Sequence, residues 1–231
     1  TCLNCMTTCP SGVQYDKLLA TGRELVEEQV QRPLTERLLR RALRLLVPYP
    51  GRFTPLLKLG QAVRPLLPAM LKAKLPDGGA LGPLPQTRHR RRVIMLENCV
   101  ESALTPAAVG AAIRVLDAAG IEVIRPGGGC CGAVSEHLAA GDEARGFMRR
   151  NIDAWWPYIA ADAADPAEAI VVTASGCGAM VKDYGHHLKN DPDYAHKAAR
   201  VSELARDPCE LLSAEDLAQR PEPVAQGVPQ R

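Results

Sequence analysis

Hydrophobic residues recur at helical spacing in the first third of the chain. Over residues 15–30, leucines and valines are separated by glutamates, and this pattern predicts an amphipathic helix. A second helix is expected over residues 35–47, where leucines occupy one side and arginines the other. We expect this basic helix to lie on a membrane surface, to contact a partner, or to pack on its own domain with its arginines in water.

Proline and glycine divide the chain after this second helix. Five prolines interrupt the leucine-rich stretch that follows and predict short helical pieces: Pro48, Pro50, Pro55, Pro65 and Pro68. Residues 76–92, PDGGALGPLPQTRHRRR, are rich in Gly and Pro and then in Arg, so we place a linker there, after a helical region at 14–75. The basic run 88–92 is interpreted as a solvated linker rather than as a binding patch.

The pattern changes beyond this linker, where short apolar runs alternate with helical stretches. Strands are predicted at 93–96, 121–124 and 169–174. Helices are expected at 105–119, 142–161, 175–188 and 192–206. This alternation predicts an α/β fold, with a module over 93–212 whose small parallel sheet is flanked by helices. Residues 213–231 are interpreted as a further linker.

Composition and charge add limits to this picture. The 231 residues are 46% hydrophobic, which is enough for one large domain or two modest ones. A net charge of +2 does not indicate nucleic-acid binding. No apolar run approaches the ~20 residues that span a bilayer. No export signal precedes Thr1, so we expect a cytoplasmic protein.

The first cysteines form a compact motif at residues 1–13. Cys2, Cys5 and Cys9, followed by Pro10, match the later part of the bacterial ferredoxin pattern C-x2-C-x2-C-x3-C-P. Such spacing lets one loop wrap several thiolates around a [4Fe–4S] cluster. The first cysteine of the pattern would precede the chain, so we expect the sequence to begin inside the motif. A zinc knuckle or a disulfide loop is the alternative.

The remaining cysteines of interest each follow a predicted strand. They are Cys99, the adjacent pair Cys130 and Cys131, and Cys177. Because the carboxyl ends of parallel strands meet at one edge of a sheet, we expect these four to converge. Four converging thiols are typical of a metal site, whereas a single buried cysteine is usually an apolar core residue.

Glycines surround these cysteines and predict how the thiolates are stabilised. Gly129 and Gly132 flank the adjacent pair, and Gly176 precedes Cys177. Glycine permits unusual backbone angles, so nearby N–H groups can donate to sulfur. We therefore assign these glycines to cofactor binding. A zinc-loaded, non-redox scaffold using the same cysteines remains the alternative.

The motifs resemble a known family. Cys99, GGGCCGAV and TASGCGAMVKDYG are similar to the cysteine-rich CCG module of heterodisulfide-reductase-type proteins. More narrowly, TTCPSGVQYDKLL, RRVIMLENC and NIDAWWP resemble the iron–sulfur subunits of glycolate oxidases (glycolate dehydrogenases). That family has two ferredoxin-type motifs followed by two CCG modules. The resemblance implies that this chain lacks the first ferredoxin motif, and that the second module would follow Arg231.

The resemblance implies an electron-transfer role. Flavin-containing partner subunits would oxidise glycolate to glyoxylate, and electrons would pass through [4Fe–4S] clusters toward a quinone or another acceptor. FAD is expected on those partners, since this chain has no Gly-x-Gly-x-x-Gly fingerprint or P-loop. Related lactate, glycerol-3-phosphate or heterodisulfide systems are alternatives. A peripheral position on the cytoplasmic face of the inner membrane is a further expectation.

The sequence departs from the general CCG pattern at one position. Met180 stands where the family pattern has its last cysteine, so Cys99, Cys130, Cys131 and Cys177 are the four candidate ligands. We interpret Met180 as a helix core residue. Cys209 matches no motif position and is interpreted as a structural or free thiol. His137 is expected on a helix surface, with proton transfer near the cluster as its alternative role.

Overall fold

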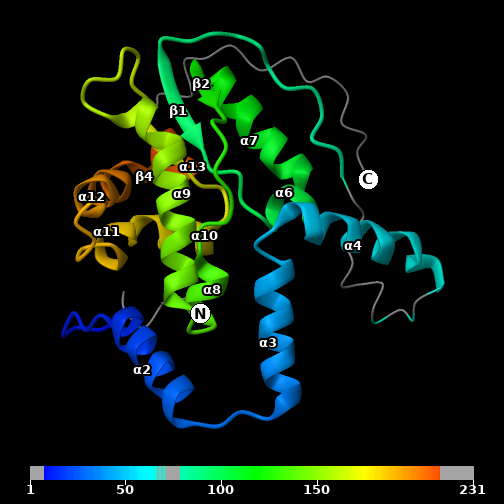
Figure 1. Ribbon diagram of the computed structural model, residues 1–231. Helices are drawn as coiled ribbons and strands as arrows, with labels where there is room; N and C mark the ends of the chain where they lie inside the picture. The colour runs from blue at the N-terminus through cyan, green and yellow to red at the C-terminus, as the bar shows by residue number, and fades with distance from the viewer. Residues whose placement is uncertain (1–7, 67, 69, 71–78, 214–231) are drawn as a thin grey trace.

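Helices make up most of the computed structural model, which describes residues 8–66, 68, 70 and 79–213 (Figure 1). The N-terminal elements are α2 (Tyr15–Gln29), α3 (Leu34–Leu46), α4 (Pro50–Ala62) and the 3-10 turn η1 (Arg64–Leu66). The helices predicted at 15–30 and 35–47 are confirmed. The short helical pieces expected after them are present as α4 and η1, although α4 runs through Pro55 without a break. Its internal Pro55 lies in the second turn, where it removes a single backbone hydrogen bond.

Four short parallel strands form the sheet of the C-terminal half. They are β1 (Arg91–Met95), β2 (Ile121–Ile124), β3 (Ala169–Val171) and β4 (Ala205–Arg206), in the spatial order β2-β1-β3-β4. Every neighbouring pair is parallel. The prediction of an α/β fold with a small parallel sheet is confirmed. Strand β4 was expected to be the end of a helix, because two residues are too few to show an alternating pattern.

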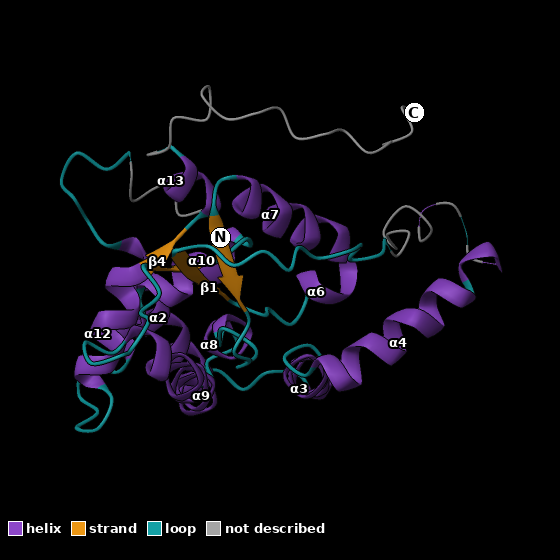
Figure 2. Cartoon of the chain, turned by 90° about the horizontal axis from the view of Figure 1, so that it is seen from above, coloured by secondary structure: helices purple, strands orange, loops and turns teal. Residues whose placement is uncertain are grey.

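Helices cover both faces of this sheet (Figure 2). They are α6 (Glu101–Leu104), α7 (Pro106–Ala118), α8 (Ala133–His137), α9 (Gly141–Ile159), α10 (Ser175–Lys182), α11 (Tyr184–His187), α12 (Ala195–Leu204) and α13 (Pro208–Leu212). Helix α7 lies on one face, and α9 and α12 lie on the other. The single helix predicted at 175–188 is wrong, since it divides at Asp183 into α10 and α11.

Residues of β1 alternate between the two sides of the core. Val93 and Met95 are fully buried against α7, and Ile94 is buried on the side of α9 and α12. This alternation follows from the period of two along a strand. Trp155 of α9 is fully buried in the larger of the two clusters. The sheet therefore has a packed core on each face, which fixes where its strands end.

The basic run before β1 is only partly solvated. Arg88 and Arg90 are exposed. Arg91 and Arg92 instead belong to β1, where Arg91 pairs with Glu168 at 2.7 Å and Arg92 with Asp165. The interpretation of the whole run as a solvated linker is therefore wrong for its last residues, because the strand begins earlier than its apolar part.

None of the described helices combines the length and the apolar character that crossing a bilayer requires.

Candidate metal centre

Four cysteines gather at the carboxyl edge of the sheet. Cys99 Sγ donates to Cys130 Sγ at 3.5 Å, and the thiol of Cys131 interacts with those of Cys130 and Cys177. Cys99, Cys130 and Cys131 are buried, and Cys177 is half-buried. The loops after β1 and β2 supply the first three, and the first turn of α10, after β3, supplies the fourth. The structure thus brings together residues that lie far apart in the sequence.

Polar side chains hold the Cys99 loop. The buried Asn98 accepts from the backbone N–H of Glu101 at 2.9 Å and donates to Glu101 Oε2 at 2.6 Å. The same carboxylate oxygen accepts from the hydroxyl of Thr173, just beyond β3. These bonds connect the loops that follow two neighbouring strands. These hydrogen bonds therefore fix the loop that carries Cys99 relative to Thr173, which lies four residues before Cys177.

Glycine is required at two positions around the adjacent cysteines. Gly128 has φ +117°, and a Cβ placed there would lie 2.6 Å from Asn151 Oδ1. Gly132 has φ +94°, and its N–H donates to Cys130 Sγ at 3.4 Å. Residues with a side chain rarely adopt such angles. The glycines let the loop turn closely around the sulfur atoms, as the sequence suggested for Gly132.

A buried polar layer supports the loop from behind. Asn151 Nδ2 donates to Cys130 O at 3.0 Å and to Tyr184 Oη at 2.9 Å. The Tyr184 hydroxyl in turn donates to Cys131 O at 2.9 Å. Trp155 Nε1 donates to Gly127 O at 3.3 Å. Sequence reasoning missed the roles of Asn151 and Tyr184. An Asn at an apolar-face position of a predicted amphipathic helix is the available signal for Asn151, because such a position is normally apolar.

Hydrogen bonds and charge favour one thiolate in this group. Bonds from Cys131 and Cys99, then the Gly132 N–H and the Arg150 guanidinium, lower the pKa of Cys130. Donation to that sulfur, together with burial, raises the pKa of Cys99 and of Cys131. Of these thiols, that of Cys130 therefore ionises most easily in the metal-free protein. Binding of a metal centre would release the protons of the other thiols.

The donor set fits an iron–sulfur cluster. Four thiols, three of them buried, are the usual ligands of a [4Fe–4S] core, and a backbone N–H already donates to one sulfur. Within the described ranges, no three His, Cys, Asp or Glu side chains are grouped to hold a single metal ion.

The structure describes only some of the other predicted site residues. Cys2 and Cys5 lie outside the described residues. Cys9 is half-buried, and bonds from the N–H groups of Val13 and Ser11 lower its pKa. Gly129 and Gly176 remain predictions. Gly176 lines the cavity described next.

An open cavity of about 360 Å³ lies between α2 and helices α8, α10 and α11, and Gly176, next to Cys177, lines it. Met180 belongs both to the cavity wall and to the core cluster that contains Cys131. Glu136, with a buried Oε2 that has no hydrogen-bond partner within the described part of the chain, also lines it. Burial raises the pKa of Asp183 in the same wall. The sequence did not reveal this cavity, because its lining comes from four separate segments.

The structure also shows the surroundings of three further residues that the sequence analysis discussed. His137 is exposed on α8, where Nδ1 lies 3.1 Å from Arg23 of α2. Met180 is buried, as expected for a core residue. Cys209 is an exposed free thiol in α13.

Comparison with known proteins agrees with this geometry. Residues 93–182 match the family model of the cysteine-rich CCG domain. The chain is 53% identical over 219 residues to the glycolate oxidase iron–sulfur subunit of Escherichia coli (strain K12), a match that covers 94% of this chain and 53% of that protein. The resemblance predicted from the cysteine motifs is confirmed.

A second relative is more distant. The chain is 28% identical over 250 residues to the probable glycolate oxidase iron–sulfur subunit of Bacillus subtilis (strain 168), covering 94% of this chain and 54% of that protein. The chain therefore spans about half the length of the curated relatives it matches. No solved structure matches it.

Proposed function

Since residues 93–182 are a cysteine-rich CCG domain, and since the chain is similar to iron–sulfur subunits of glycolate oxidase, we propose that it is an electron-transfer subunit of a glycolate-oxidising complex. The observation that carries the proposal is the convergence of Cys99, Cys130, Cys131 and Cys177 at one edge of the sheet. A [4Fe–4S] cluster bound there would supply a one-electron redox couple.

The chain's own residues would hold and tune that centre. The four thiolates would be its ligands, and Cys2, Cys5 and Cys9 would serve ferredoxin-type [4Fe–4S] clusters. The Gly132 N–H and the Arg150 guanidinium already favour negative charge on Cys130. Hydrogen bonds and positive charge near ligand sulfur raise a reduction potential. Burial of three thiols also keeps water away from the site.

The substrate chemistry would belong to partner subunits. Oxidation of glycolate to glyoxylate releases two electrons and two protons, which a partner's FAD can accept together. This chain would then pass the electrons on singly toward an acceptor of the quinone class. A quinone lies in the membrane, so this acceptor would require peripheral membrane contact, and we propose the cytoplasmic face as its place.

Cysteine variants of the full chain test the proposal. We would purify the chain anaerobically and measure iron, acid-labile sulfide and the EPR spectrum of the reduced protein. Cys99→Ser and Cys177→Ser are expected to lose the signal of the module's cluster. Cys209→Ser is the matched control, because this thiol is exposed and matches no position of the cysteine motifs.

Two results would contradict the proposal. One is a colourless, zinc-loaded protein after anaerobic reconstitution with iron and sulfide. The other is equal iron content in Cys177→Ser and Cys209→Ser, which would show that the gathered thiols are not ligands.

A further inference from the structure

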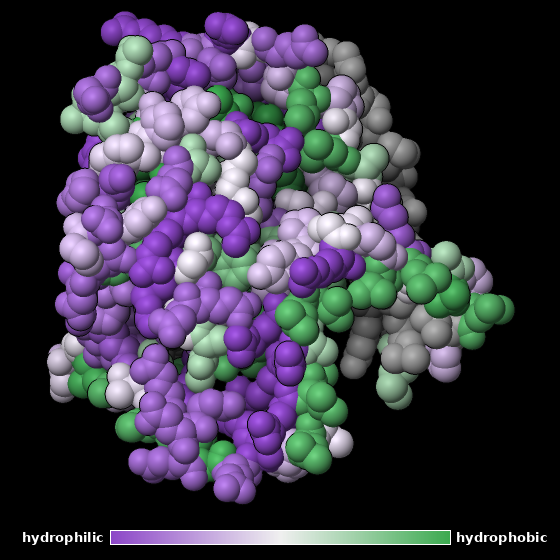
Figure 3. Space-filling view, in the orientation of Figure 1, coloured by the Kyte–Doolittle hydropathy of each residue, from purple (hydrophilic) through white to green (hydrophobic). Residues whose placement is uncertain are grey.

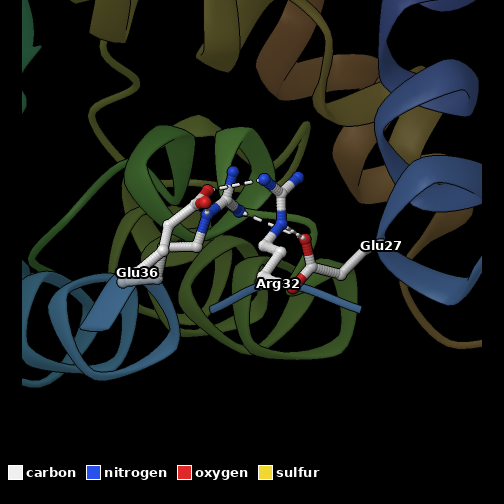
Figure 4. Close-up of polar contacts among 4 residues, drawn as sticks. Glu27, Arg32 and Glu36 are labelled. Carbon is white, nitrogen blue, oxygen red and sulfur yellow. Dashed lines mark hydrogen bonds and ion pairs between the residues drawn. The ribbon is translucent and has the colours of Figure 1, made fainter. Parts of the chain in front are cut away.

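Helix α3 turns part of its charged side, Glu36, Arg40 and Arg44, toward the protein. Arg40 pairs with Glu36 at 3.2 Å and with Glu27 of α2 at 3.4 Å. Arg32, in the connection between the two helices, pairs with Glu27 at 2.7 Å and with Glu36 at 2.5 Å (Figure 4). These four side chains form one network, which holds α3 to α2.

A second polar contact holds the last turn of α3. Arg44 Nε donates to Glu143 Oε2 of α9 at 2.8 Å, and Glu143 Oε1 accepts from Ser135 of α8 at 3.2 Å. The expectation that the arginines of a self-packed helix would lie in water is therefore wrong for Arg40 and Arg44. Both bind carboxylates of the protein.

Three leucines of α3 lie away from these polar contacts. No residue of this helix is buried. Leu34, Leu38 and Leu45 lie on one side at helical spacing, and 72%, 67% and 48% of their surface is exposed. A helix packed on a soluble protein normally shows the reverse arrangement, with its apolar side inward. Leu34, Leu38 and Leu45 therefore stay largely uncovered by the described residues.

The exposed apolar surface continues onto α4 and η1. Leu56, Leu59, Val63 and Leu66 recur at intervals of three and four residues, and all four are exposed. Figure 3 shows hydrophobic surface along the outer side of α3 and along α4. In Figure 2, α4 extends away from the sheet and its helices. We call these seven residues (Leu34, Leu38, Leu45, Leu56, Leu59, Val63 and Leu66) the leucine face.

Positive charge accompanies the leucine face. Residues 34–70 contain seven Arg and Lys but a single Glu, whereas the whole chain has a net charge of only +2. Glu36, that single acid, is already bound to Arg32 and Arg40. Arg37 and Arg41 are exposed on α3, and Lys58 is exposed on α4. An apolar strip bordered by basic residues matches the boundary between anionic headgroups and acyl chains.

We infer that the leucine face lies on an anionic lipid surface, with Arg37, Arg41 and Lys58 at the phosphate groups. A protein partner is the competing occupant. Lipid is favoured because the surface offers basic side chains and leucines with almost no acceptor group, which is what a headgroup layer complements. The inference deepens the proposed function, on which it rests for the reason why this chain would meet a membrane.

Vesicle sedimentation of the full, iron-loaded chain tests the inference. The probes are vesicles of phosphatidylcholine alone and vesicles that also contain phosphatidylglycerol. We expect binding only to the second kind, and weaker binding at high salt. The triple change Leu34→Gln, Leu38→Gln and Leu45→Gln should lower the partition coefficient roughly 100-fold or more, because three leucines no longer enter the interface.

Charge variants make the test more specific. Arg37→Gln with Arg41→Gln should lower the partition coefficient roughly 25-fold, since each basic residue near an anionic surface contributes about fivefold. The matched control is Arg88→Gln with Arg90→Gln, which removes the same charge from another exposed basic run. Exposed leucines on α2 provide the apolar control, as Leu18→Gln with Leu25→Gln. Both controls should bind as the wild type does.

Two outcomes would overturn the inference. One is a wild-type chain that binds neither kind of vesicle. If its leucine variant also loses co-purification with flavin subunits, the leucine face is a protein interface. The other is equal loss of vesicle binding in the test and control variants. Iron content and EPR are measured on the same samples. Loss of iron with vesicle binding retained would count against the proposed function, and not against the lipid surface.

Discussion

Replacing Gly128 by alanine tests how the cysteine loop is held. At φ +117° a residue with a side chain is strained by about 1–3 kcal/mol. Its Cβ would lie 2.6 Å from Asn151 Oδ1, so the amide group must move. Its bonds to Cys130 O and Tyr184 Oη would weaken, at a further cost of about 1–3 kcal/mol. The free energy of unfolding should therefore fall by roughly 2–6 kcal/mol.

Thermal unfolding of the iron-free chain measures this effect. In a chain of this size, each kcal/mol changes the midpoint by about 2–4 °C, so the midpoint should fall by about 5 °C or more. Gly146→Ala is the matched control. Gly146 lies in α9 without a positive φ, and a Cβ there meets nothing within 4 Å. This control should gain about 0.5–1 kcal/mol. A Gly128→Ala chain that unfolds at the wild-type midpoint would refute the reasoning.

Three further changes address the support of the site and its surroundings. Tyr184→Phe should lower the free energy of unfolding by about 1–3 kcal/mol in urea titration, because Cys131 O is left buried without its donor; an equal loss in Tyr158→Phe would contradict this. Met180→Ala should cost about 2–5 kcal/mol in the same assay, since it opens the wall between the core and the cavity, and a loss below 1 kcal/mol would show that the wall is not packed. Desolvation lowers the pKa of His137 and of His186, so the unfolded chain binds more protons than the folded one. The free energy of unfolding should fall as the pH drops below about 6.5, and urea titrations across pH should show that the double change to Gln removes this slope.

The convergence of the cysteines could be expected from the sequence for a definite reason. Strands β1, β2 and β3 each contain a short apolar run, and parallel strands end at the same edge. The residues after those runs had to meet, whatever the detailed packing. Gly132 could be interpreted in the same way, since a positive φ is easiest for glycine. Their role as cluster ligands stays a prediction.

Other features depend on tertiary contacts that no local pattern records. Asn151 and Tyr184 act through backbone carbonyls of the cysteine loop, which lies more than twenty residues away in the chain. Strand β4 is defined only by its pairing with β3, in which Ala205 lies next to Ile170, and its two residues carry no pattern of their own. The orientation of α3 could not be deduced either. Its amphipathic pattern shows that two sides differ, but only the positions of Glu27 and Glu143 determine which side meets the protein.

The distribution of the four gathered cysteines has a consequence for the order of events during synthesis. Because each loop depends on a different strand, no short peptide contains the complete set, and the set comes into existence only after β1, β2 and β3 have paired. Such long-range pairing is a late and comparatively slow step. Cys2, Cys5 and Cys9, in contrast, lie within one short segment that precedes all of these strands in the chain. If both groups bind iron, the module would accept it only after its strands have paired, whereas the N-terminal segment would need no such pairing to bring its cysteines together.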